Sequence, residues 1–179
     1  MSRFSFLPLI GLLFILSASR LQAQNIRISD PIKYNDYMVE RQDQFGAELL
    51  KLIDLFDVLP EDKSVVDGQL ERVVGSAQEG ITAMNKLKPL KGDFGLHQSA
   101  LELFVFYEET MRTDYGKIID ELYKDAPDLD ALNEVLLRIE GEESKLDNAF
   151  FQAQNSYAKM HNFSLIENSL QEEFDAIED

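Results

Sequence analysis

The sequence predicts an all-α protein, an antiparallel up-down-up-down four-helix bundle with a short acidic C-terminal tail. Apolar residues recur at alternating steps of three and four along four long segments, which is typical of helices that bury one face. Short connections that contain proline or glycine separate these segments. The 179 residues, of which 45% are hydrophobic and 28% charged, suit a single packed domain.

The first helix is predicted from Asp30 to about Leu59. Asp30 is a favourable N-cap, Pro31 fits the first helical position, and Pro60 ends the segment. Its predicted buried stripe consists of Asn35, Met38, Gln42, Phe45, Leu49, Leu52, Phe56 and Leu59.

The second helix is predicted from Asp62 or Ser64 to about Lys88. Its apolar stripe is the weakest of the four, because each glycine inside a helix costs about 0.5–1 kcal/mol relative to alanine. The small residues also allow a neighbouring helix to approach closely. The glycines in question are Gly68, Gly75 and Gly80.

The third helix is predicted from about Leu96 to Lys124, where Ala126-Pro127 breaks the pattern. Its stripe consists of Leu101, Phe104, Glu108, Met111, Tyr115, Ile118 and Leu122. Asp128 then caps a fourth helix that reaches about Asn162. The fourth stripe consists of Leu129, Leu132, Leu136, Ile139, Glu143, Leu146, Phe150, Ala153, Tyr157 and Met160.

The connections predict the topology. The short breaks after Leu59 and Lys124 require consecutive helices to run antiparallel. The loop at 89–95 is too short to cross a bundle about 40 Å tall at 1.5 Å per helical residue. We therefore expect each helix to lie beside the one before it.

Three polar residues interrupt the apolar stripes. In the predicted topology Gln42, Glu108 and Glu143 fall at nearly the same height, and the second helix meets this level near residues 76–79. Two facing carboxyl groups in a core raise at least one pKa, unless a cation or a base neutralises them.

Two interpretations of this polar layer are open. In the favoured one it is structural: the glutamates pair with Arg112, Arg138 or Lys145, or hydrogen-bond Gln42 and a tyrosine hydroxyl, and so fix helix register. In the alternative, Gln42, Glu108 and Glu143 form an oxygen-only site for a divalent cation or a small ligand.

The sequence contains none of the familiar catalytic or metal-binding patterns. There is no cysteine, and neither His97 nor His161 follows a glutamate by three residues, as di-iron bundles require. No Gly-x-Ser-x-Gly segment is present. We therefore predict a non-enzymatic protein with no catalytic residues, no metal ligands and no cofactor.

Residues 1–23 have the pattern of a cleaved signal peptide. Arg3 precedes an apolar run at residues 6–16, and small residues lead to a cleavage point after Ala23. The bundle then covers 24–164, and the acidic tail at 165–179 is expected to be a short helix or disordered. We expect an exported protein, periplasmic, secreted or associated with the cell surface, with no stable membrane anchor after cleavage.

The net charge limits the partners. Removal of the leader deletes Arg3 and Arg20 and no acid, which takes the net charge from −16 to −18. Such a surface repels nucleic acid and anionic lipid, and it attracts basic proteins and divalent cations. A protein partner is compatible with this charge, whereas the sequence specifies no oligomeric state.

Three short motifs resemble a known family. They are Tyr34-Asn-Asp-Tyr-Met-Val39 with Gln42, Phe106-Tyr-Glu108 followed by Tyr115, and Glu142-Glu-Ser-Lys-Leu-Asp147 followed by Ala153-Gln154 and Ala158. In this order and spacing the chain resembles an uncharacterised family of exported helical surface proteins of spirochaetes and Bacteroidota. The resemblance covers residues 30–163 and implies export and a helical fold, with no activity and no site residues.

The leading functional prediction is an exported helical bundle with a structural or partner-binding role. The alternative is a bundle that binds a divalent cation or a small ligand through its polar layer. A hydrolase has almost no support, because no histidine stands at a recognisable spacing from a serine.

Overall fold

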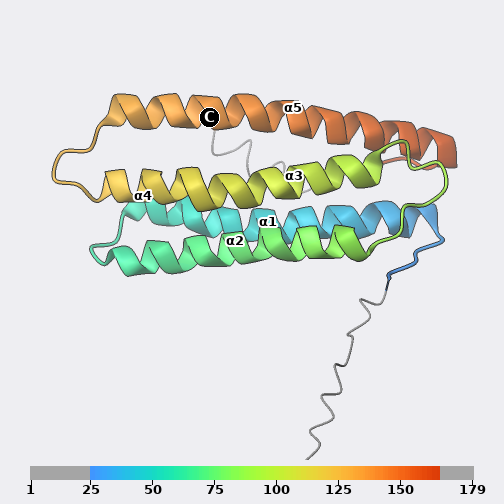
Figure 1. The fold of residues 1–179 in the computed structure, drawn as a ribbon, viewed down its shortest axis with the longest axis horizontal. Helices are drawn as coiled ribbons and strands as arrows, with labels where there is room; N and C mark the ends of the chain where they lie inside the picture. Colours follow the sequence, from blue (N-terminus) through green and yellow to red (C-terminus); the bar gives the residue numbers. More distant parts are fainter. Residues whose placement is uncertain (1–24, 166–179) are drawn as a thin grey trace, which may run out of the picture.

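A computed structural model describes residues 25–165 as four long helices side by side (Figure 1). They are α1 (Pro31–Val58), α2 (Lys63–Lys86), a third helix in three consecutive parts, and α5 (Leu129–His161). The third helix comprises α3 (Leu96–Thr110), a π-helical segment (Met111–Tyr115) and α4 (Gly116–Leu122). The predicted all-α four-helix fold is confirmed.

Aspartate side chains begin three of the helices as the sequence predicts. The side chains of Asp30, Asp62 and Asp128 accept hydrogen bonds from backbone N–H groups in the first turns of α1, α2 and α5. These bonds satisfy donors that would otherwise have no partner in the helix. Asn162 ends α5 in the left-handed conformation, with φ 57°.

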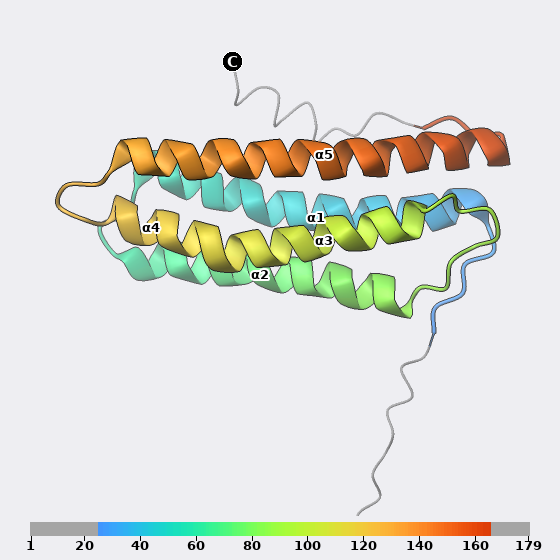
Figure 2. The ribbon, with the colours of Figure 1, turned by 45° about the horizontal axis from the view of Figure 1, so that its top comes forward.

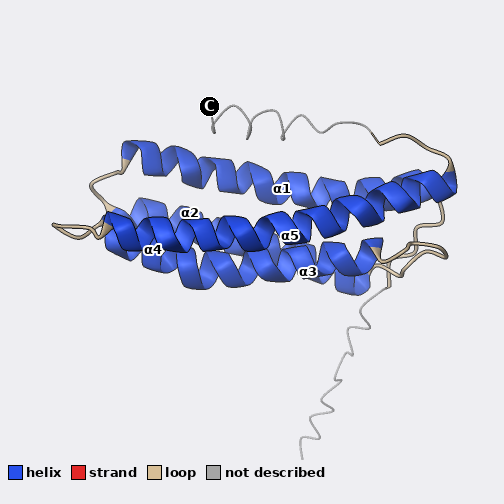
Figure 3. Ribbon diagram, turned by 90° about the horizontal axis from the view of Figure 1, so that it is seen from above, coloured by secondary structure: helices blue, strands red, loops and turns tan. Residues whose placement is uncertain are grey.

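Consecutive helices pack against each other in an up-down-up-down order (Figures 1 and 2). α1 packs on α2, α2 on α3, and α3 on α5, whereas α1 and α5 make few contacts. Seen from above, α1 and α5 lie close at one end and diverge toward the other (Figure 3). The bundle is therefore open along one seam.

The main core fills the space between α1, α2, the third helix and the second half of α5. Its largest fully buried side chains are Tyr34, Tyr157, Phe104, Met38, Leu52, Met84, Leu96, Leu103, Ile119, Val66 and Val73. A second, smaller cluster consists of Ile118, Leu132 and Ile139 and holds the first half of α5 against α4. The first half of α5 thus depends on few buried residues.

Gly80 allows α2 and α3 to approach closely. A Cβ atom at this position would lie 2.4 Å from the Phe104 ring, so the ring occupies the space that any side chain would need. Gly68 and Gly75 have no such neighbour within 4 Å. Of the three glycines on which the sequence predicts a close approach, Gly80 alone provides one within the described residues.

The segment before α1 adds a contact that the sequence analysis did not predict. Ile26 forms a parallel bridge with Leu87 at the end of α2: its N–H donates to the Lys86 carbonyl at 2.8 Å, and its carbonyl accepts from the Lys88 N–H at 3.0 Å. This pairing attaches the start of the described chain to the α2–α3 connection.

The predicted signal peptide and nearly all of the predicted acidic tail lie outside the described residues. Within residues 25–165, no helix combines the length and the apolar composition that crossing a bilayer requires.

Substitution of Gly80 by alanine is expected to destabilise the protein. The new methyl group forces Phe104 to move, and overpacking of this kind lowers the free energy of unfolding by about 1–3 kcal/mol. Gly75→Ala is the matched control on the same helix, and it should raise stability by about 0.5–1 kcal/mol because of its better helix propensity. Urea denaturation measures both, and equal stabilisation by the two substitutions would contradict the close approach at Gly80.

Candidate functional site

The structure gives the three polar residues of the sequence prediction different neighbours. Glu108 accepts hydrogen bonds from Gln78 of α2 at 3.1 Å and from Arg112 Nε at 2.9 Å. Arg112 also forms an ion pair with it at 2.7 Å. These bonds lower the pKa of Glu108, the Arg112 bond most of all. Glu108 therefore stays ionised at the α2–α3 surface.

Gln42 lies on the side of α1 that faces α5. It is half-buried and follows Asn35 by seven residues, close to two helical turns. The Asn35 side-chain oxygen accepts a hydrogen bond from Gln154 of α5 at 2.9 Å. Gln42 thus shares the open seam of the bundle, away from the Glu108 contacts.

On the third helix, Glu143 contacts Tyr107 and not Glu108. Tyr107 takes the buried position beside Glu108, and its hydroxyl donates to Asp147 at 3.4 Å and also interacts with Glu143. Glu143 and Asp147 are one turn apart on α5, so both carboxyl groups lie on one face of that helix. The structural interpretation of the polar layer fits each glutamate differently: an arginine contacts Glu108 and a tyrosine contacts Glu143.

The π-helical segment brings a second tyrosine to Glu143. Tyr107 and Tyr115 are eight residues apart, which in an uninterrupted α-helix places them about 80° apart around the axis. The π turn accommodates one extra residue, so the two side chains align as if about seven residues separated them. The charge of Glu143 acts on both tyrosines and contributes to raising the pKa of each.

Burial favours the protonated form of the Glu143 and Asp147 carboxyl groups. Burial, and next the nearby charge of Asp147, raises the pKa of Glu143 to about 7, and Tyr107 opposes part of that rise. Burial of its carboxyl group likewise raises the pKa of Asp147, although the side chain as a whole is exposed. Among the described residues, no lysine, arginine or histidine forms an ion pair with either carboxylate.

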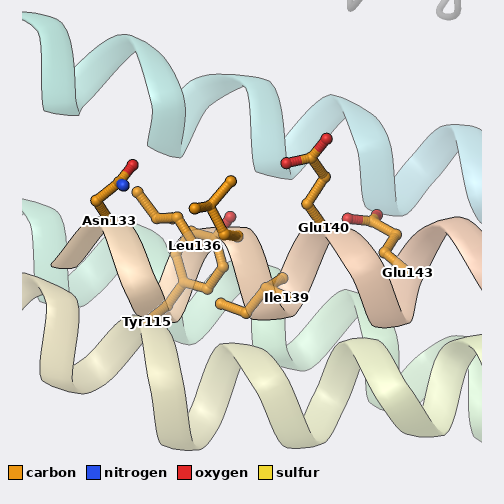
Figure 4. A pocket seen from close by; sticks show the side chains of 7 residues that line it. Tyr115, Asn133, Leu136, Ile139, Glu140 and Glu143 are labelled. Atoms are coloured by element: carbon orange, nitrogen blue, oxygen red, sulfur yellow. The ribbon is translucent and has the colours of Figure 1, made fainter. Parts of the chain in front are cut away.

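A hollow of about 300 Å³ opens next to Glu143 on the side of α5 that faces α1 (Figure 4). We call it the α5 hollow. Tyr115 contributes to its lining, and its ring stacks on Phe56 of α1 with centroids 6.3 Å apart. The lining residues are Tyr115, Asn133, Leu136, Leu137, Ile139, Glu140 and Glu143.

Leucines of α5 beside the hollow are exposed, which differs from the predicted stripe. The exposed fractions are 66% for Leu129, 42% for Leu136 and 57% for Leu137. The sequence analysis placed Leu129 and Leu136 in the core because their spacing is regular. They are exposed because α1 diverges from the first half of α5, so no helix within residues 25–165 covers this face (Figure 3).

A second polar group lies at the opposite end of α5, and the sequence analysis did not predict it. The Tyr34 hydroxyl donates to Asp93 at 3.3 Å, and the Tyr34 and Tyr157 rings are 5.6 Å apart. The Tyr157 hydroxyl and His161 Nε2 are buried and have no hydrogen-bond partner among the described residues. Only the α2–α3 loop brings Asp93 here, so periodicity gives no sign of the group.

The described part of the chain brings no three histidine, aspartate or glutamate side chains close enough to hold a metal ion. This holds for the predicted layer as well, because Glu108 and Glu143 have separate partners. What the arrangement can do is accept a positively charged or hydrogen-bonding group at Glu143 in the hollow, with Asp147 one turn further along α5.

Comparison of the chain with protein-family models, with curated proteins and with solved structures gave no match. The family resemblance inferred from the three motifs stays a prediction.

The raised pKa of Glu143 predicts a specific dependence of stability on pH. The value is 4.5 for a free glutamate and about 7 in the fold, so the folded protein binds the extra proton and loses stability as pH rises through this window. Glu143→Gln should remove this loss and, at pH 8, raise the free energy of unfolding by about 1–3 kcal/mol relative to wild type.

Urea denaturation at pH 5 and pH 8 measures this effect. Glu79→Gln on the exposed face of α2 is the control for removal of one negative charge. If Glu143→Gln and wild type lose equal stability between the two pH values, Glu143 does not titrate in this window.

Loss of the hydroxyl group should change stability differently at Tyr34 of α1 and at Tyr157 of α5. Tyr34→Phe breaks the bond to Asp93 and should lower the free energy of unfolding by about 0.5–1.5 kcal/mol. Tyr157→Phe removes a buried hydroxyl that has no partner among the described residues, so stability should stay unchanged or rise by up to about 1 kcal/mol. Thermal melting compares them, and an equal loss in both would mean that the Tyr157 hydroxyl is hydrogen-bonded in solution.

Proposed function

We propose that this protein is an exported, non-enzymatic helical bundle that binds a helical segment of another protein along the first half of α5. The observation that carries the proposal is the uncovered apolar face of α5 beside the α5 hollow, where Leu129, Leu136 and Leu137 are exposed. The apolar run of residues 6–16, followed by small residues up to Ala23, supports export.

The shape of this face favours a helix as the occupant. Leu129, Asn133, Leu136, Glu140 and Glu143 follow one another at steps of four and three, so they form one stripe along α5. Asn133, Leu136 and Glu140 point from α5 toward α1 (Figure 4). An amphipathic helix that lies along such a stripe buries its own apolar face against the leucines.

Charge selects another protein over a second copy of this chain. The net charge of −16 makes two copies repel, and Glu140 and Glu143 line the hollow itself. The acidic C-terminal residues 166–179 contain six acids and no lysine or arginine, so the same repulsion opposes their docking here. A partner segment without excess negative charge meets no such penalty.

The alternative function, a site for a divalent cation or a small ligand at the polar layer, has less support. Gln42, Glu108 and Glu143 have no contact in common, and the described residues offer no group of three acidic or histidine ligands.

The proposal predicts that the exposed leucines are required for binding. The probe is a synthetic amphipathic helical peptide with leucines at steps of three and four, compared with a scrambled peptide of the same composition. Leu136→Ser with Leu137→Ser should weaken binding of the amphipathic peptide at least about tenfold, because both side chains lose apolar contact area. Fluorescence anisotropy of the labelled peptide measures the affinity.

Val105→Ser is the matched control, since Val105 is an exposed apolar residue of α3 outside the hollow. It should leave the affinity unchanged. Equal binding of the scrambled peptide, or an affinity that the leucine substitutions do not alter, would refute the docking function.

A further inference from the structure

We infer that the partner segment carries a lysine or arginine, placed two helical turns from its apolar anchor residues, that pairs with Glu143 and Asp147. The inference rests on the proposed function and specifies the chemistry of the segment that the α5 hollow receives. Its basis is the position of two unpaired carboxylates on the same face of α5 as the exposed leucines.

Glu143 and Asp147 lack a positively charged partner among the described residues. Glu143 and Asp147 lie one turn apart, both contact the Tyr107 hydroxyl, and no base among the described residues pairs with either. Lys145 is the nearest base along α5, but it lies two residues from each acid, does not share their face, and forms no ion pair among the described residues. Arg138 pairs instead with Asp114 at 2.8 Å and with Glu142 at 3.7 Å. Two partly buried carboxylates without a cation are unfavourable when ionised.

Both carboxylates can be reached from outside the bundle. Glu143 lines the α5 hollow and is half-buried, so a group that enters the hollow can reach its carboxylate. Asp147 is exposed one turn further along the same face. A cation from outside can therefore meet both acids without any rearrangement of α5.

The distance between the exposed leucine and the carboxylates along α5 determines where the partner's cation must stand. Leu136 and Glu143 are seven residues apart on α5, which is about 10 Å along the axis at 1.5 Å per residue. A partner helix that lies along α5 and packs on Leu136 reaches Glu143 about two turns from that contact, and Asp147 lies one turn beyond Glu143. Lysine and arginine fit because their long apolar stems lie along apolar surface while the charged end reaches an acid.

A pair of peptides tests the inference on the purified full-length protein. Both carry the same leucine stripe; one has lysine two turns from the central leucine and the other has the uncharged isostere norleucine at that position. The lysine peptide should bind wild type about fivefold to tenfold more tightly, because a charge-assisted hydrogen bond forms only with it. Glu143→Gln with Asp147→Asn should abolish this preference and leave the affinity of the norleucine peptide unchanged or improved.

The control removes the same charge elsewhere. Glu71→Gln with Glu79→Gln changes two exposed acids of α2, a helix that packs on α1 and α3. This variant should keep the preference for lysine. Loss of the preference in both double variants would show that only the overall charge matters, which would overturn the inference.

The outcomes separate this inference from the proposed function. If Leu136→Ser with Leu137→Ser weakens both peptides but wild type does not prefer lysine, the docking function stands and the paired cation is wrong. If neither peptide depends on the leucines, the docking function fails as well.

Two further measurements test the other occupants of the hollow. A chain that ends at Leu165 and binds the norleucine peptide much more tightly than the full chain would show that residues 166–179 occupy the hollow. Sedimentation of a dimer that Leu136→Ser with Leu137→Ser dissociates would show that a second copy does. Either result would overturn the inference, whereas a monomer with an unchanged peptide affinity after truncation supports it.

Discussion

The interaction on which the rest of the bundle depends most is that of Tyr107, a single residue of the third helix that contacts both α1 and α5. Its ring stacks on Phe45 of α1 with centroids 4.2 Å apart, and its hydroxyl reaches Asp147 and Glu143 of α5. A tyrosine can do both because it joins an apolar ring to a polar tip. The third helix therefore makes most of the contacts that hold α5 in place. Because of this, α1 can diverge from α5 without loss of the main core.

The π-helical segment is the second constraint, because it changes which residues of the third helix face α5. Without the extra residue, Tyr115 would turn away from the face that Tyr107 occupies. With it, Tyr115 stacks on Phe56 and contributes to the lining of the hollow. In the same segment Asp114 forms an ion pair with Arg138 at 2.8 Å, so this pair attaches α5 to the third helix in addition to the Tyr107 contacts.

Helix caps, prolines and apolar periodicity predicted the four helices well. The π turn and the uncovered face of α5 were missed because they depend on packing between distant segments. Aspartate caps and prolines act on residues only a few positions away, so the bounds of α1 and α5 could be predicted from the sequence. Gly116 directly follows the π turn, but a single glycine inside a helical pattern does not by itself predict a π turn. A regular apolar stripe also does not show whether a neighbouring helix covers it. Glu143 was identified because it interrupts a stripe, whereas its partner Asp147 lies outside that stripe and became visible only with Tyr107 in place.

The coincidence of two departures from ordinary packing is the strongest reason to regard this face of α5 as functional. An apolar side chain at position 143 would fit between Ile139 and Leu146, yet the chain holds a carboxyl group there whose ionisation burial opposes. On the same face, the exposed Leu136 lies two turns away and the exposed Leu129 about four turns away. Either feature alone is tolerated in many folds, but a sequence that departs from local consistency twice on one surface does so most often where function requires it. Stability alone would favour covering the leucines and neutralising the acids, and a bound segment that carries a cation does both.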